Sequence, residues 1–354
     1  MITQPRRAPA RTSSRCSYRP AAAAALFLLS AGTARAQGEV DLRLFRPSLT
    51  ITGIGTTKSD FSDPDIDAEY RSSNVTLLAN IPLGPAHLKA GGGLLGWQPM
   101  LTIGAGATDQ TFNLPTVDRE PRLYNGLVNG SVLLISSKPN MHYISVGASF
   151  AEEEDTVSNP DIRGSAIYFG TYRKSPAWTL VYGGAYSFVY GRGLLLPAFG
   201  LIWTPNQNWT LSGILPFGWR LSQKLGETTF LNYVVWVSGQ RYGFENDGTF
   251  TVPGEFRDDK VYERVREQHL GVELELGRGR PFAFLAQAGV AVARRLAFTP
   301  IESGSGSAIE SRPDALVDDA IDPAPYLRLS FRVPLGKSLL DEVRDQKKGE
   351  LGEP

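Results

Sequence analysis

The chain has 354 residues, with 36 basic and 36 acidic side chains, three histidines and a single cysteine. This charge balance argues against a nucleic-acid partner, because binding to phosphates requires clustered Lys and Arg. One cysteine excludes a disulfide framework.

The first 36 residues have the pattern of a secretory signal peptide. Arginines without any acid precede the apolar run "AAAAALFLLSAGTA", and Ala34-Arg35-Ala36 supplies a small-x-small cleavage pattern. The alternative is a membrane anchor, but the run is shorter than the ~20 residues of a spanning helix. Cleavage would start the mature chain at Gln37, remove Cys16, and leave 30 basic and 36 acidic residues, a net charge of −6.

Strand-like stretches recur through the rest of the chain, from "SLTITGIGT" to "PYLRLSFRVPL". They are rich in Gly, β-branched and aromatic residues, a composition typical of sheet. Many approach the ~9–11 residues that a tilted strand needs to cross a bilayer, and no later apolar run is long enough for a spanning helix. The composition therefore predicts an all-β protein.

The predicted connections alternate between short and long. The short ones lie at 84–86, 137–140, 175–177, 205–208 and 278–281. The long polar ones lie at 58–73, 104–121, 152–161, 245–259 and 299–323, and two tight ones lie near 191–193 and 216–217. Bacterial outer-membrane barrels combine short periplasmic turns with long outer loops. We therefore predict a single antiparallel transmembrane β-barrel, an up-and-down meander of about 14 strands with both ends periplasmic; twelve is the next even count.

The stretch "HLGVELELG" shows how such strands would face. Its aliphatic residues Leu270 to Leu276 alternate with His269, Glu273 and Glu275, and successive side chains of a strand point to opposite faces. A sheet that spans a bilayer must close on itself, so the aliphatic row would face lipid and the polar row the lumen. A soluble β-sandwich shows the same alternation in any one strand and is the alternative.

The same parity places a set of polar side chains inside the barrel. Pairing Gly277 with Pro281 sets Glu275 opposite Ala283 and Glu263 opposite Arg295. The predicted lumen-lining residues are Asn232, Glu263, His269, Glu273, Glu275, Arg295, Arg328 and Arg332. They could form a charged lining that selects solutes, or an ion-pair network that fills the lumen, and the strand number leaves both open.

Three tryptophans lie beside predicted short turns: Trp178, Trp203 and Trp209. Aromatic residues gather where barrel strands cross the headgroup layer, so we predict a membrane-interface girdle. Core packing is the alternative for each one singly.

The polar residues give no sign of catalysis or of a metal site. His142 and Ser145 are three apart and would lie on opposite faces, and no serine partner is evident for His269. The acidic run from Asp60 to Glu69 could attract Ca²⁺ but lacks the glycine and spacing of an EF-hand, so a solvated loop is the simpler interpretation. We predict no enzyme activity, no cofactor and no metal.

The segment "LLLPAFGLIWTPNQNWTLSGILP", residues 194–216, resembles a family of uncharacterised bacterial outer-membrane β-barrel proteins. Its members combine a Pro-containing strand, a "P-N" turn and a strand ending in Leu-Pro. The resemblance implies fold and location only. The chain departs from the common barrel pattern because a polar tail, and not a terminal aromatic residue, follows the last strand near Leu335.

The sequence thus predicts a signal peptide at 1–36, an outer-membrane barrel at 37–335 and a polar tail at 336–354. The predicted function is a porin-like channel or transporter for small solutes in a Gram-negative envelope. The alternative is a non-conducting surface or envelope-structure barrel, and a barrel enzyme is the least favoured class. Expected partners are outer-membrane lipid, lipopolysaccharide, the barrel assembly machinery and a small solute.

Overall fold

The computed structural model describes residues 47–336, except 63–67, 85–86, 89–93, 115–116, 137–139, 190–191, 247, 249, 251–255, 279 and 303–315. The predicted signal peptide, and the predicted tail from residue 337 onward, lie outside the described residues.

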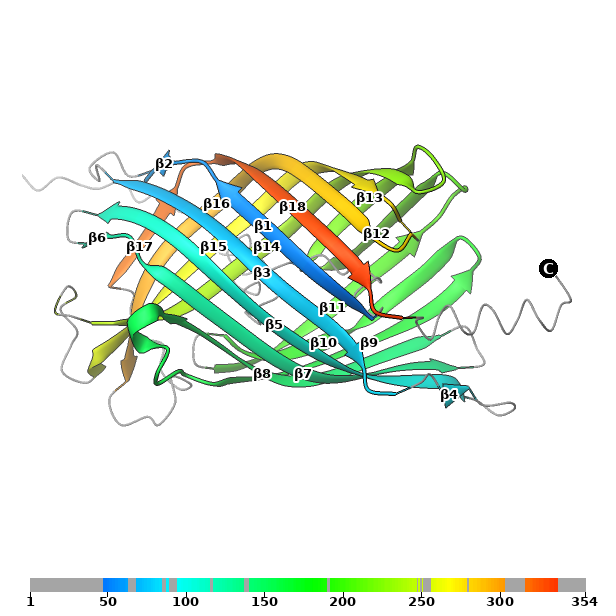
Figure 1. Ribbon diagram of the computed structural model, residues 1–354, viewed down its shortest axis with the longest axis horizontal. Coiled ribbons are helices and arrows are strands. Elements are labelled where there is room, and N and C mark those ends of the chain that lie inside the picture. Colours follow the sequence, from blue (N-terminus) through cyan, green and yellow to red (C-terminus); the bar gives the residue numbers. More distant parts are fainter. Residues whose placement is uncertain are drawn as a thin grey trace, which may run out of the picture.

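Fourteen strands form one closed antiparallel barrel (Figure 1), each paired with the next, and β1 pairs with both β3 and β18 to close the ring. They are β1 (Ser48–Thr56), β3 (Glu69–Pro82), β5 (Leu94–Leu114), β7 (Arg122–Ser136), β8 (Met141–Glu153), β9 (Arg163–Ser175), β10 (Trp178–Val189), β11 (Arg192–Trp203), β12 (Trp209–Leu215), β13 (Gly218–Lys224), β14 (Thr229–Glu245), β15 (Phe256–Leu276), β16 (Ala283–Glu302) and β18 (Ala324–Pro334). The predicted 14-strand up-and-down barrel is confirmed.

Four short strands extend the ladders: β2 (Ser59–Asp60), β4 (His87–Leu88), β6 (Val117–Arg119) and β17 (Val317–Ile321). A 3-10 helix, η2 (Glu154–Thr156), follows β8. Within the described part of the chain, no helix has the length and apolar character required to cross a bilayer. We call the end of the barrel near β2, β6, β17 and η2 the outer end. The inner end carries the turns at 176–177, 204–208 and 225–228.

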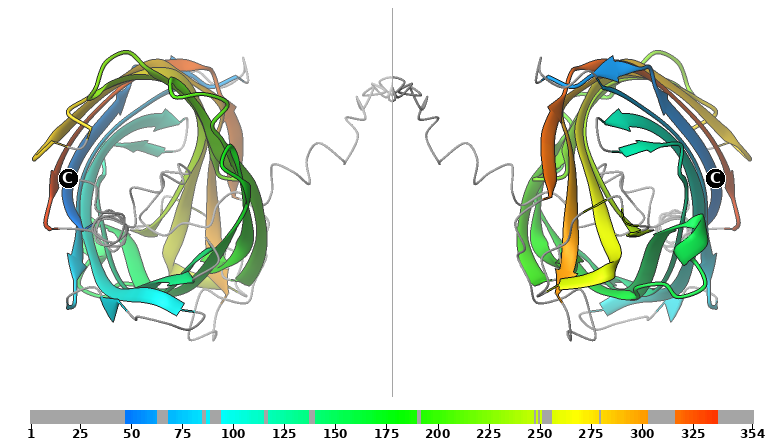
Figure 2. Two further views of the ribbon diagram at one scale, coloured as in Figure 1. Left: turned by 90° about the vertical axis from the view of Figure 1, so that its right-hand side faces the viewer. Right: turned by 90° about the vertical axis from the view of Figure 1, so that its left-hand side faces the viewer.

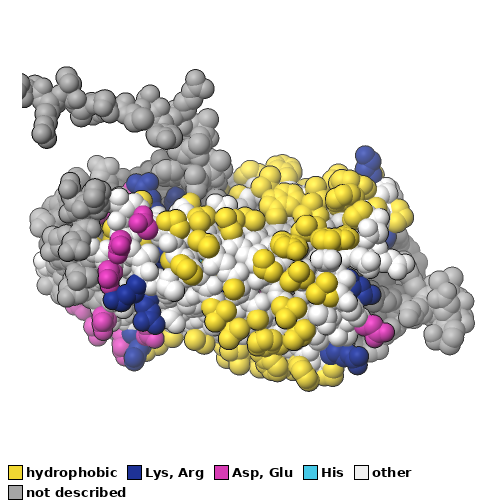
Figure 3. Space-filling model, turned by 90° about the horizontal axis from the view of Figure 1, so that it is seen from above, with side chains coloured by type: hydrophobic (Ala, Val, Ile, Leu, Met, Phe, Trp, Pro, Cys, Tyr) yellow, Lys and Arg dark blue, Asp and Glu magenta, His cyan; other side chains and the backbone are white. Residues whose placement is uncertain are grey.

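The exterior of the barrel is apolar over most of its length. On β15, Leu270, Val272, Leu274 and Leu276 are exposed, while the alternating residues His269, Glu273 and Glu275 are buried in the interior. Figure 3 shows apolar side chains spread over the wall and charged side chains gathered at the two ends. The period of two in the sequence thus separates the two faces of each strand.

Several strands run further toward the outer end than the sequence predicts. β5 continues to Leu114 and β15 begins at Phe256, although the sequence predicts loops at 104–121 and 245–259. Hydrophobic alternation weakens in these extensions because their exterior face carries polar residues such as Asp109 and Arg266. Pairing along the ladder, and not an apolar exterior, keeps them extended.

The wall of the barrel is uneven in height. β12 and β13 have seven residues each, whereas β15 has 21. Beyond the short strands, β14 reaches β8, and Gly243 pairs with Glu152 in a parallel bridge. Gly243 has no room for a side chain, because a Cβ atom there would overlap Oε2 of Glu152. The barrel therefore narrows at its outer end; Figure 2 views it from each end.

Candidate functional site in the barrel interior

We divide the interior along the barrel axis into an outer, a middle and an inner level. The outer level, at the outer end, is filled by an apolar cluster. Phe298 makes edge-on contacts with Phe112 and Phe244, at centroid distances of 5.6 and 5.9 Å. The other buried members are Phe61, Ala68, Tyr70, Leu123, Tyr242, Phe250, Val261, Val265, Leu296 and Ile321. We call this set the outer aromatic cluster. It packs like a protein core across the narrowed end, so it blocks the axial path there.

Charged groups join β8 and the segment that follows it to β15 beside this cluster. Nζ of Lys260 lies 2.7 Å from Oε2 of Glu152 and 3.0 Å from Oδ2 of Asp161. The Tyr262 hydroxyl donates a hydrogen bond to Asp161, and the guanidinium of Arg241 stacks 3.7 Å from the centre of the Tyr262 ring. Because Glu152 is fully buried, these charge-assisted contacts stabilise the narrowed end. We call this network of Glu152, Asp161, Arg241, Lys260 and Tyr262 the charged lock.

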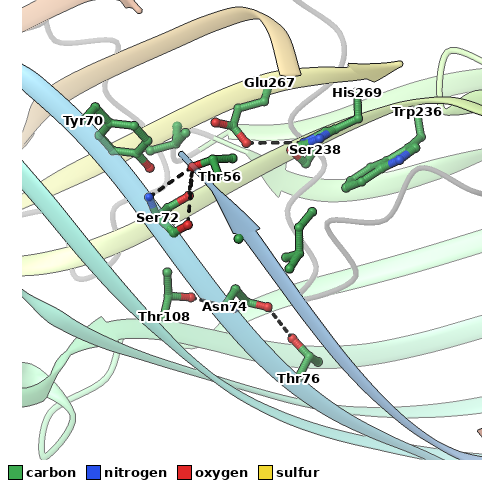
Figure 4. A pocket seen from close by; sticks show the side chains of 13 residues that line it. Thr56, Tyr70, Ser72, Asn74, Thr76, Thr108, Trp236, Ser238, Glu267 and His269 are labelled. Atoms are coloured by element: carbon green, nitrogen blue, oxygen red, sulfur yellow. Dashed lines mark hydrogen bonds and ion pairs between the residues drawn. The ribbon is translucent and has the colours of Figure 1, made fainter. Parts of the chain in front are cut away.

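The middle level contains a small cavity of about 60 Å³ between β1, β3, β5, β14 and β15. Figure 4 shows its polar lining, in which hydroxyl and amide groups face Trp236 and His269. These groups belong to Thr56, Ser72, Asn74, Thr76 and Thr108. A cavity of this size holds a few water molecules or one small polar group.

His269 lies at the centre of this level. Its ring stacks on Trp236 at 3.9 Å and meets the edge of Tyr326 at 4.7 Å. Its Nε2 lies 3.0 Å from Oγ of Ser238 and 3.3 Å from Oε2 of Glu267. In a catalytic triad the acid holds the opposite ring nitrogen. Here Ser238 and Glu267 both contact Nε2, so the three residues do not have the arrangement of a catalytic triad.

Sequence reasoning missed Ser238 as a partner of His269. The signal lies in the register of β14 with β15, which pairs Trp236 with His269 and Ser238 with Glu267. Because same-face residues lie two apart, this register brings Ser238 next to the imidazole. The other ring nitrogen, Nδ1, is buried and has no hydrogen-bond partner among the described residues.

The inner level has a polar side formed by β13 to β18. Arg220 lies 3.1 Å from Oε1 of Glu273, and Asn232 donates a hydrogen bond of 2.8 Å to the same carboxylate. Arg278 donates to Glu275 at 3.0 Å, and Arg328 to Gln287 at 3.2 Å. The predicted residues Asn232, Glu273, Glu275 and Arg328 are thus buried together, with Arg220 and Arg278 as partners that sequence reasoning missed.

The opposite side of the inner level is apolar. One cluster joins Met100, Leu133, Ile135 and Tyr143 of β5, β7 and β8. A second joins Val181, Ala198 and Ile214 of β10, β11 and β12, with Phe169, Ile202 and Phe217 packed against it. The interior is therefore amphipathic, with charged pairs on one side and aliphatic and aromatic groups on the other.

The predicted register between β15 and β16 is wrong. Glu275 pairs with Leu285 and not Ala283, because the turn after Gly277, which adopts a φ of 82°, extends through Phe282. Glu263, which is fully buried, pairs with Phe298 and not Arg295. The loop is longer than the sequence suggests, so the register is displaced by two residues at Glu275, and a further shift beyond Gln268 makes the displacement three residues at Glu263.

A second irregularity moves Arg295 to the exterior. The ladder shifts between Arg266 and Gln268, and Ala293 adopts a φ of 49°, the geometry of a β-bulge. Arg295 is exposed and lies 2.5 Å from Asp318. Its neighbour Arg294 takes the inward position and pairs with Glu267 at 2.8 Å. The prediction that Arg295 lines the lumen is therefore wrong. Arg332, partly buried, pairs with Ala283 and with Thr50 across its two ladders.

The three tryptophans lie at the inner end. Trp178 opens β10, Trp203 closes β11, and their rings stack at a centroid distance of 5.5 Å. Trp209 opens β12 after the turn at 204–208. Their placement on strand ends matches the predicted positions, and a headgroup role stays a prediction.

The acidic loop yields no metal site in the described residues, among which no three His, Cys, Asp or Glu side chains gather as ligands would. Its central residues Asp63, Asp65 and Asp67 lie outside that part of the chain. At its ends, Asp60 pairs in register with Glu69, which binds Lys58 at 2.5 Å.

No protein-family model matches the chain, and no curated protein is significantly similar to it. Several solved barrels align over most of its length. The translocator domain of the autotransporter NalP from Neisseria meningitidis has 13% identity and a TM-score of 0.33, covering 82% of this chain and 88% of its own. The toluene transporter TodX from Pseudomonas putida has 9% identity and a TM-score of 0.33, with coverages of 81% and 89%.

An outer membrane channel from Pseudomonas putida F1 has 5% identity and a TM-score of 0.32, covering 83% of this chain and 99% of its own. All three TM-scores lie well below 0.5, so these similarities are too weak to carry an inference about function. Function is therefore inferred from the barrel itself.

Proposed function

We propose that the protein is an outer-membrane β-barrel that passes a small solute through a lumen closed at rest. The location is supported by the apolar exterior of a sheet that closes on itself. Exposed rows such as Leu327, Leu329 and Phe331 on β18 would be unfavourable in water, and a closed ring leaves no strand edge at β1 and β18. Export by the predicted signal peptide is part of this proposal.

Passage of a solute is supported mainly by the polar cavity at the middle level. A buried Nδ1 of His269 borders it without a partner in the described residues, and an orphaned buried polar atom is costly unless a ligand or water satisfies it. A purely structural barrel would gain stability by filling this space with apolar side chains. We propose no catalytic role for Ser238, His269 and Glu267, because both partners use the same imidazole nitrogen.

A closed resting state is supported by the outer aromatic cluster and by the charged lock. A solute larger than the cavity can cross along the barrel axis only if Phe298 and its neighbours move. If the side chains of the outer aromatic cluster never move, the cluster instead favours the alternative, a non-conducting envelope barrel. The two functions therefore differ in whether the outer end can open.

Planar-bilayer recordings test this difference. Wild-type protein should show brief, rare openings, and Phe298→Ala should increase the open fraction, because truncation empties the centre of the outer aromatic cluster. Glu152→Gln should act in the same direction by weakening the charged lock without creating a cavity. Phe331→Ala, which truncates an exposed exterior ring, is the matched control and should leave the recordings unchanged.

Truncating a buried Phe costs about 3–5 kcal/mol, so folding of each variant must be checked by its heat-dependent migration on gels. Folded wild-type and variant barrels that all stay silent, with no flux of sugars or amino acids into vesicles, would establish the non-conducting alternative.

A further inference from the structure

The hydrogen-bonded wall of the barrel has a break between β11 and β14. β11 pairs with β12 only over Phe199–Trp203, so its residues 192–198 have β10 as their only partner strand in the described chain. β14 has no ladder pairing with β13 beyond Trp236. Val237 still donates a backbone hydrogen bond of 3.2 Å to the Phe217 carbonyl, and the Arg163 guanidinium donates to the Arg241 carbonyl at 2.9 Å, so the break lies between these two contacts. The short strands β12 and β13 end below this break, at the turn of Pro216 and Phe217.

The break lies at the level of the apolar exterior. Leu195 and Phe199, on the outward face of β11, are 72% and 65% exposed. Backbone groups left unpaired in hydrocarbon are costly. A break at this height therefore differs from the polar extensions at the outer end, where water can satisfy the backbone.

Apolar side chains line the inner side of the break. Val181, Ala198 and Ile214 are buried there, and Phe217 packs against them and meets Phe169 edge-on at 6.3 Å. The axial route past this point is blocked by the outer aromatic cluster and by the bridge from Gly243 to Glu152. The lumen thus has an apolar surface that leads to the wall and a packed core that closes its axis.

We propose that the break is a lateral portal that connects the lumen with the bilayer, and that its solute has an apolar aliphatic or aromatic body. Such a molecule would contact the apolar side through Ile214 and Phe217 and keep any polar group toward the charged pairs of β13 to β16. The role of the portal rests on the proposed function, because a portal is useful only if a solute passes through the barrel. Whether lipid-dissolved molecules reach the interior through the break can be tested separately.

Cysteine labelling from within the bilayer tests the portal. Single cysteines are introduced in a Cys16→Ser background, and folded protein in vesicles is exposed to pyrene maleimide dissolved in the lipid. Ile214→Cys points inward immediately below the portal, Leu215→Cys points outward at its edge, and Ser330→Cys points inward behind a fully paired part of the wall. Val181→Cys replaces Ile214→Cys if that variant does not fold.

We expect Ile214→Cys to react nearly as fast as Leu215→Cys, because the ladder between β11 and β12 ends one residue beyond Ile214. Ser330→Cys should react at most about one tenth as fast, because the ladders on both sides of Ser330 continue in both directions and separate it from lipid. Labelling at Ile214→Cys no faster than at Ser330→Cys overturns the portal. Solute flux through wild-type barrels with an unreactive Ile214→Cys would overturn the portal while the proposed function stands.

A second measurement tests the solute class. Cells that produce the wild-type protein should take up the apolar dye 1-N-phenylnaphthylamine faster than cells that produce Ala198→Trp, which fills the inner side of the portal. Ser330→Trp adds the same bulk to the opposite wall and should not slow uptake. Equal uptake with wild type and Ala198→Trp contradicts an apolar solute at this site.

Discussion

Arg294 and Arg295 are adjacent in sequence and point to opposite faces of the barrel wall. Arg294 is buried with Glu267, whereas Arg295 pairs with Asp318 at the exposed outer end. A buried ion pair is strongly destabilised when one partner is removed, because the other charge stays buried without compensation. An exposed pair contributes little, because water screens it.

Arg294→Met should therefore lower the free energy of unfolding by about 3–5 kcal/mol, and Arg295→Met should change it by about 1 kcal/mol or less. Urea titration in lipid vesicles, followed by tryptophan fluorescence, measures both variants. Equal effects of the two substitutions would contradict the bulge at Ala293.

At the scale of one strand, β15 combines two environments along a single face. Its exterior side carries the exposed apolar residues Leu270 to Leu276 toward the inner end, and Gln268, Arg266 and Arg264 toward the outer end. The boundary between them marks where the proposed hydrocarbon layer ends.

Val272→Arg should impair folding into bilayers by about 2–4 kcal/mol, whereas Gln268→Arg should cost at most about 1 kcal/mol, because a charge on the lipid face is costly only near the midplane. Folding yield in vesicles, read from heat-dependent gel migration, compares the two. Similar yields would mean that the exterior row of β15 does not face lipid.

At the scale of the whole molecule, the closed ring of 14 strands predicts an unusual stability in detergent. Folded protein should fractionate with the outer membrane and migrate faster on gels before boiling than after it. Its N-terminal residue should be Gln37 if the signal peptide is cleaved as predicted. Recovery as a soluble periplasmic protein would exclude the proposed location.

The sequence by itself determined the all-β barrel class and the two faces of most strands, and it favoured fourteen strands over twelve. An alternation with period two assigns the same faces to a strand alone and to a strand in the barrel. Each side chain's face depends only on whether its position along the strand is odd or even. That is why the alternation alone was enough to place Glu273, Glu275, His269, Asn232 and Arg328 inside the barrel, where all five are buried.

Only the tertiary structure decided the rest, because it depends on residues far apart in the chain. One bulge places Arg294, and not Arg295, in the interior of the barrel. A longer turn displaces the register of β16 against β15 by two residues. The contact of β8 with β14, the partners Ser238 and Arg220, and the break beside β11 all arise from strand lengths and registers around the ring. No local pattern encodes these, since closure is a property of the whole sheet.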